Sequence, residues 1–517
     1  MSTRRSRLRR HLPVLLLYSL LSLALTWPLI TQFASHVPGD GIDDPALAWN
    51  LWWIKHSLVD QQINPFLSGW MFYPIGINLA FYTLTVLNGL LSVPVQVAFD
   101  LVPASNLALL SSFVLSGYGA YLLALQVVGG WRIPQRMENS GWGGSDIPQR
   151  MKNSGWGGRN IPQRMEDNGW GGSDIPQRMK DNGWGGSDIP QRMKNSEWRR
   201  DGSTFIAHHS SFIVSLSAFL AGLLYAYSSS KLFYAALGQF NIASSQWIPF
   251  AVLYVLRSGR RGARLREPLL AALFLLLQAY AELTYATFLV IFIALFAGYR
   301  GAQIVVRGWR ERKETRASSS EAVRLIRNLA LMALVFVVGL TPVLANMLPD
   351  MRAEGDFLVE GGGFADIFSA DLAGFALPTQ LHPLLGDVVR TLSQNSAQQP
   401  DGRQWQVDKG QHLTLGWVGM ALALVGFVAG RRRGAWLWLL SAALFFLLAL
   451  GPSLRIAGHD TGLAGPFRIL QELPFFKGNR YSSRFSVMLL ISVAPLVAFG
   501  AQWLLARLAA AWQRRHD

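Results

Sequence analysis

LLLQAYAELTYATFLV, residues 275–290, decides how often this chain can cross a membrane. It belongs to an apolar block that runs from 268 to 299 and contains a single carboxylate, Glu282. About 20 apolar residues cross a bilayer core, so the block forms either one long tilted helix or a hairpin of two spans. A charge inside such a run is costly, and a hairpin would place Glu282 near its outer tip. We predict the hairpin, with spans at 268–281 and 283–299.

The composition of the whole chain indicates a polytopic, all-α membrane protein. Of 517 residues, 51% are hydrophobic and only 15% are charged, whereas soluble domains carry about 25% charged residues. The net charge of +16 comes largely from arginine clusters between apolar runs, which is typical of topology signals. This source of charge argues against nucleic-acid binding. The absence of cysteine excludes disulfides and thiolate sites.

Apolar runs predict about ten transmembrane helices. They lie at 12–30, 104–128, 204–227, 242–256, 268–281, 283–299, 328–348, 413–429, 435–452 and 485–506. The stretch 79–101 contains Asn88, Pro94 and Asp100, so we interpret it as an interfacial helix that does not cross. With this count, all arginine-rich loops and both termini fall on the cytoplasmic side of the cell membrane.

Five segments follow from this topology. Residues 1–132 hold the first span, a large external loop with interfacial helices, and the second span. Residues 203–348 form a transmembrane bundle, 349–412 an external loop, and 413–517 the last spans with a basic external loop at 453–484. Residues 133–202 are five tandem 14-residue copies, beginning with IPQRMENSGWGGSD. Each copy offers little apolar surface, so we predict a disordered cytoplasmic insert; a partner-binding array is the alternative.

Three aspartates occur in PGDGIDDPALAWNLWWIKH, residues 38–56. Asp44 precedes Pro45, a pattern that predicts a helix with Asp44 as its N-cap. Asp40 lies in PGDG, which also suits a plain turn. The functional alternative is that Asp40, Asp43 and Asp44 crowd an outward-facing site. A carboxylate there could accept a proton from a sugar hydroxyl or bind a divalent cation, and the sequence does not choose between these roles.

Basic residues gather in GPFRILQELPFFKGNRYSSRF, residues 465–485, on the predicted outer side. This placement opposes the positive-inside bias, so a stabilising partner is expected. An anionic lipid phosphate would suit them, because arginine bonds phosphate in a bidentate manner and lysine adds a point charge. Ion pairs with the acidic segment 349–412 are the alternative. The candidates are Arg468, Lys477, Arg480 and Arg484.

Motifs at 49–56 (WNLWWIKH), 64–96, 246–250 (QWIPF) and 479–487 (NRYSSRFSV) resemble the GT-C superfamily of membrane glycosyltransferases. The likeness is to bacterial protein-mannosyltransferase-like and aminoarabinose-transferase-like members, and it covers nearly all the chain except the repeats. It implies a polyprenyl-phosphate-linked sugar donor and a catalytic aspartate among Asp40, Asp43 and Asp44.

The same resemblance implies basic residues near the donor phosphate, at Arg480 and Arg484 by analogy. Lys55 and His56, which end the first motif, are further candidates for this role. Many members carry a second acid after the third span, but SSSKLFYAALGQFN, residues 228–241, contains none. Glu282 is the residue that could replace it.

The resulting expectation is inverting sugar transfer at the outer membrane face, with lipid-linked donor and membrane lipids as partners. Neither the sugar, the acceptor nor a cofactor is specified by the sequence. A transporter or flippase of lipid-linked substrates is the rival interpretation, and a non-catalytic membrane scaffold is a third.

Overall fold

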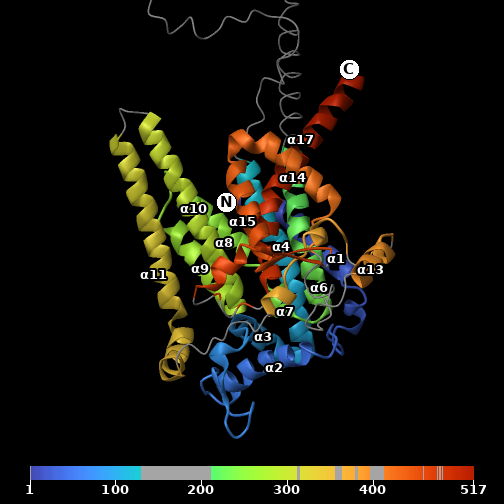
Figure 1. Ribbon diagram of the computed structural model, residues 1–517, viewed down its shortest axis with the longest axis vertical. Helices are drawn as coiled ribbons and strands as arrows, with labels where there is room; N and C mark the ends of the chain where they lie inside the picture. Colours follow the sequence, from blue (N-terminus) through green and yellow to red (C-terminus); the bar gives the residue numbers. More distant parts are fainter. Residues whose placement is uncertain are drawn as a thin grey trace, which may run out of the picture. The chain divides into compact units, whose positions relative to one another are not determined.

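The computed structural model describes residues 2–129, 211–310, 315–354, 364–378, 382, 384–395, 413–457, 459–473, 476, 479 and 481–516 (Figure 1). The repeats at 133–202, Lys477 and Arg480 lie outside these ranges. The chain divides into two compact units, one of residues 131–212 and one of residues 1–130 with 213–517. All elements that follow belong to the larger unit, except that one helix begins at Ser211.

The described chain is mostly helical, which confirms the all-α class. Its strands form two short antiparallel ladders: β1 (Leu67–Ser68) with β2 (Ile77–Asn78), and β3 (Ser453–Ile456) with β4 (His459–Ala464). The shorter helical elements are η1 (Leu29–Gln32), η2 (His56–Asp60), η3 (Leu79–Phe81), α12 (Phe364–Ile367), η7 (Ala373–Phe375), α13 (Gly386–Asn395), η8 (Arg431–Arg433) and α16 (Phe467–Gln471).

Four helices are long and apolar enough to cross a membrane: α4 (Leu101–Val128), α10 (Leu283–Arg310), α11 (Thr315–Glu354) and α17 (Ser486–His516). A fifth crossing is possible if Ser211–Ala226 and α6 (Ser229–Ala236), which are bent by 44°, act as one span. Apolar parts of α1 (Ser2–Leu25), α3 (Val86–Phe99) and α15 (Ala435–Ala449) are shorter. A helical membrane protein is therefore supported, while the count of ten spans stays a prediction.

The apolar block around Glu282 folds as the predicted hairpin. Helix α9 (Arg266–Ala281) ends when Glu282 takes an extended conformation, with φ −156° and ψ 104°, and α10 begins at the next residue. At the other end of the α9–α10 pair, Arg300 Nη2 of α10 donates to the carbonyl of Gly259 over 2.9 Å. Gly259 lies seven residues before the start of α9. The chain therefore runs out along α9 and returns along α10, with Glu282 at the turn.

One predicted span is wrong as a single helix. Residues 242–256 divide into α7 (Phe240–Ala243) and α8 (Ile248–Ser258), which are separated by a non-helical segment. Pro249 lies in the first turn of α8, the place in a helix where a missing backbone N–H costs little. This break leaves α8 only 11 residues long, too short to cross a bilayer core of about 30 Å.

Helices α14 (Trp417–Gly430) and α17 touch backbone to backbone. A methyl group added at Gly426 would overlap the Leu496 carbonyl, and one added at Gly500 would overlap the Leu422 carbonyl. Small residues at such crossings are typical of helix packing inside membranes, where close van der Waals contact stabilises helix pairs.

The first loop forms a layer of its own from α2 (Asp44–Lys55) and α3, which lie together at one end of the helices in Figure 1. Gln96 Nε2 of α3 donates to the carbonyl of Leu51 in α2 over 2.9 Å. Asn50 Nδ2 of α2 donates to the carbonyl of Thr83 over 2.7 Å. The first bond joins α3 to α2, and the second holds the segment between η3 and α3, which forms part of one wall of the site below.

Candidate functional site

A cavity of about 280 Å³ lies where the first loop meets the tip of the α9–α10 hairpin. Its first wall is residues 79–86, and its second is residues 279–284. Val343 and Met347 of α11 close a third side, and Phe476 and Asn479 of the last loop contribute a fourth. Four distant parts of the sequence therefore meet around one space.

Glu282 lines this cavity and is only 6% exposed. Asn241 Nδ2 donates to its Oε2 over a long 3.4 Å. Within the described chain, no basic side chain lies within 4.0 Å of this carboxylate. Of the predicted acids, Glu282 is the one that the cavity wall includes, and its burial argues against a tip charge that simply reaches water.

Arg484 supplies positive charge near this carboxylate. It lies on η10 (Ser482–Phe485) with its guanidinium 4.0 Å from the Tyr481 ring centroid and 5.9 Å from that of Tyr234. Its guanidinium interacts electrostatically with Glu282 but is not part of the cavity wall. Buried Arg484 Nε has no hydrogen-bond partner among the described residues, so part of its hydrogen-bonding capacity is unused.

Further buried polar atoms around the cavity also have no partner in the described chain. Thr85 Oγ1 and Asn479 Nδ2 belong to residues of the cavity wall, and Asn241 Oδ1 belongs to the residue that bonds Glu282. The hydroxyl of Tyr234, whose ring lies beside Arg484, is a fourth. Buried polar groups in folded proteins are nearly always hydrogen-bonded, so these four atoms are free to bond water or a polar ligand.

The break between α7 and α8 positions Asn241. Two carbonyls of this segment accept side-chain bonds: Ser244 from Gln278 Nε2, and Ile242 from the Tyr285 hydroxyl, both over 2.9 Å. Asn88 Nδ2 donates to Ser244 Oγ over 3.0 Å. Irregular backbone is stable inside a helical bundle only when its polar groups are satisfied in this way.

Lys231 of α6 is a buried charge that the sequence interpretation missed. Its Nζ donates to Ser116 Oγ over 2.6 Å, to the Ser112 carbonyl over 3.0 Å and to Ser245 Oγ over 3.3 Å. These three acceptors use all three ammonium donors. A lone lysine in the apolar stretch KLFYAAL, residues 231–237, was the available signal.

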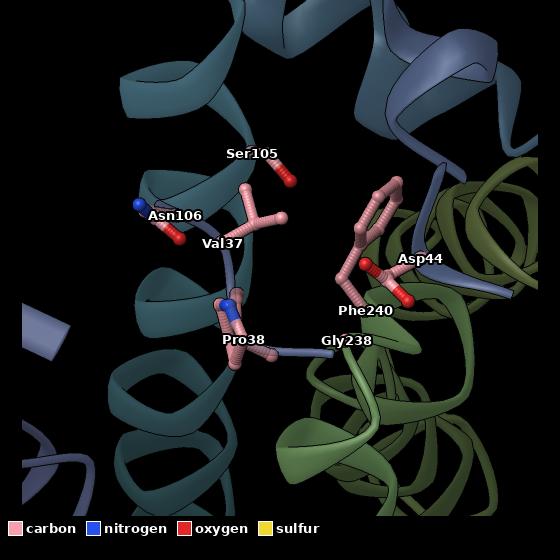
Figure 2. A pocket seen from close by; sticks show the side chains of 8 residues that line it. Val37, Pro38, Asp44, Ser105, Asn106, Gly238 and Phe240 are labelled. Atoms are coloured by element: carbon pink, nitrogen blue, oxygen red, sulfur yellow. The ribbon is translucent and has the colours of Figure 1, made fainter. Parts of the chain in front are cut away.

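Asp44 does not cap its helix as predicted. Helix α2 begins one residue earlier than predicted. Asp43 is the N-cap, and its carbonyl accepts the first helical bond, from the N–H of Leu47. The Asp44 carboxylate instead accepts from the Gly41 N–H over 2.8 Å. Figure 2 shows Asp44 and Phe240 facing Ser105 across a small pocket of about 10 Å³. That volume suits about one water molecule, not a sugar.

The other two aspartates differ from each other. Asp40 Oδ1 accepts from the Ile42 N–H over 3.1 Å, so Asp40 forms the exposed turn that its sequence also suits. Asp43 accepts a hydrogen bond from Gln239 Nε2. Its negative charge also influences the phenol of Tyr82, a residue of the cavity wall. Partial burial raises the pKa of the Tyr82 phenol, and the Asp43 carboxylate raises it further, because it disfavours a second negative charge nearby.

None of the predicted basic residues that the structure describes lines the cavity, Arg484 included. Lys55 forms an ion pair with Asp60 at 3.0 Å, and His56 stacks on Trp52 with a centroid distance of 4.6 Å. Arg468 of α16 is exposed. Lys477 and Arg480 fall outside the described residues.

Comparison with known proteins gives no match, whether to family models, to curated proteins or to solved structures.

Proposed function

We propose that this chain is a multi-pass cell-membrane glycosyltransferase of the GT-C type, with both termini in the cytoplasm. It transfers a hexosyl or pentosyl group from a polyprenyl-phosphate-linked donor to an acceptor hydroxyl at the outer membrane face. The observation that carries this proposal is the buried Glu282 carboxylate in the wall of a 280 Å³ cavity. Arg484 lies within electrostatic range of it.

The proposed reaction uses Glu282 as general base. The acceptor oxygen attacks the anomeric carbon on the face opposite the phosphate, the bond from that carbon to the phosphate oxygen breaks, and the acceptor proton passes to Glu282. The lipid phosphate leaves with its electron pair, and Arg484 stabilises the developing charge. Thr85 and Asn479, whose buried polar atoms have no partner in the described chain, are suited to sugar hydroxyls.

The test uses purified protein in liposomes with tritiated polyprenyl-phosphate mannose, glucose, arabinose or aminoarabinose, and a bacterial envelope extract as acceptor. Glu282→Gln should lower transfer at least about 100-fold, since general bases contribute roughly 10²–10⁴-fold. Asp387→Asn, which removes an exposed charge on α13, should leave the rate unchanged. Full transfer by Glu282→Gln would refute the assignment.

A transporter of lipid-linked substrates is the second candidate, because Lys231 adds a second buried charge to the helical bundle. Charged groups and interrupted helices inside the membrane are common in transporters. Lys231 lies near the start of α6, just after the bend between Ser211–Ala226 and α6. The same liposomes separate the two candidates. Movement of the labelled lipid between leaflets without sugar transfer, lost in Lys231→Met, would favour transport.

A further inference from the structure

Three arginine-bearing segments meet at the far end of the α9–α10 hairpin. They are the α8–α9 connection at 257–266, the last turns of α10 at 300–307, and the first turns of α11 at 321–327. Glu321 holds them together and is 8% exposed. Its two oxygens accept from Arg300 Nη2 over 2.9 Å and from Arg261 Nε over 3.0 Å.

Positive charge at this end greatly exceeds negative charge. The three segments carry nine arginines, and the carboxylates among and beside them in the described chain are Glu267 and Glu321. Glu321 already pairs with two arginines, and a third, Arg307, has its Nη1 4.0 Å from Glu321 Oε1. Glu267 is paired as well, with Arg266 at 3.0 Å. Partial burial and then Arg257 lower the pKa of Arg260, while Glu267 partly offsets the effect.

Three of these guanidinium groups are unused. The side chains of Arg260, Arg264 and Arg324 make no hydrogen bond or ion pair with any described residue. A topology signal needs only a number of positive charges along the sequence. It does not require Arg300 and Arg261, which are 21 and 60 residues from Glu321 in the sequence, to bond one buried carboxylate, so the cluster has more order than a topology signal needs.

We infer that this cluster binds the phosphate head group of an anionic phospholipid in the adjacent leaflet. Arginine forms paired hydrogen bonds with phosphate, and basic pockets between membrane helices are suited to such head groups. Helices α10 and α11 are both long and apolar enough to cross the membrane. Trp309, 83% exposed, and the exposed Val306 and Ile326 lie next to the arginines, where they can contact glycerol and acyl chains.

The experiment is native mass spectrometry of the whole protein in neutral detergent with added dioleoyl phosphatidylglycerol or phosphatidylcholine. Wild type should bind phosphatidylglycerol preferentially. The variant Arg264→Gln with Arg324→Gln removes two charges without breaking a described bond. Each basic group near an anionic surface contributes roughly 1 kcal/mol, or about fivefold, so affinity should fall about 25-fold.

Arg431→Gln with Arg432→Gln is the matched control, because it removes the same charge from the η8 loop. It should change phosphatidylglycerol affinity less than about twofold, and both variants should keep the wild-type unfolding temperature without lipid. Equal losses in the two variants would overturn the inference, since the attraction would then be a general surface effect. Equal wild-type binding of the two lipids would overturn it as well.

Discussion

Asn241 Nδ2 lies 3.4 Å from Glu282 Oε2 at the turn of the α9–α10 hairpin. This contact joins a short helix of the interrupted segment to the carboxylate of the cavity wall. It is a long hydrogen bond, so it orients Glu282 without holding its charge strongly.

Asn241→Ala should therefore lower sugar transfer about tenfold, because one hydrogen bond to a charged group contributes roughly 1.5–3 kcal/mol and this one is long. The measurement is the initial rate in liposomes. Asn88→Ala is the control, since Asn88 supports the same segment through Ser244 but does not touch Glu282. An equal loss in both variants would mean that the segment, not the contact, matters.

Gly426→Val should destabilise the α14–α17 pair, because its side chain has no room beside the Leu496 carbonyl. We expect a loss of about 3 kcal/mol, at the upper end of the usual cost of overpacking, and a lower midpoint of thermal unfolding in detergent. Gly301→Val, at a helical glycine with open space around it, should change the midpoint little. Similar midpoints for the two variants would contradict the backbone contact.

Gly238→Ala tests the packing of the first loop against the segment after α6. Gly238 has φ +68°, and an added methyl group would overlap the Pro38 carbonyl and crowd Asp44. Gly41→Ala is a matched control, since Gly41 has φ +78° but open space around it. Both substitutions incur the left-handed backbone penalty of roughly 1 kcal/mol. The larger drop in unfolding midpoint should come from Gly238→Ala, and the reverse order would be inconsistent with this contact.

Glu321→Gln should destabilise the protein strongly, because it leaves Arg300 and Arg261 without their shared counter-charge. Removing one partner of a buried ion pair costs roughly 3–5 kcal/mol, and exposure of Arg261 should reduce the effect to about 2–3 kcal/mol. The check is thermal unfolding at low and high salt. Asp387→Asn breaks an exposed pair with Arg390 and should have almost no effect; an unchanged midpoint in Glu321→Gln would contradict the central role of this carboxylate.

The helical class and the hairpin at Glu282 could both be predicted from the sequence. Both follow from local chemistry: apolar runs require a bilayer or a core, and one carboxylate in a 32-residue apolar block favours a turn at that point. The same local logic left a turn and a site open at Asp40, and it placed the α2 cap one residue late, at Asp44 instead of Asp43.

Which charged groups meet could not be predicted from the sequence and depends on the three-dimensional packing. About two hundred residues separate the first-loop wall from Glu282, and about as many separate Glu282 from Asn479. Spacing along the chain does not predict that such distant residues line one cavity. Burial of Lys231 was equally hidden, because its three acceptors come from α4 and from the break before α8. The physical reason is that a cavity or a buried charge is defined by what packs around it, and packing joins residues that the sequence keeps apart.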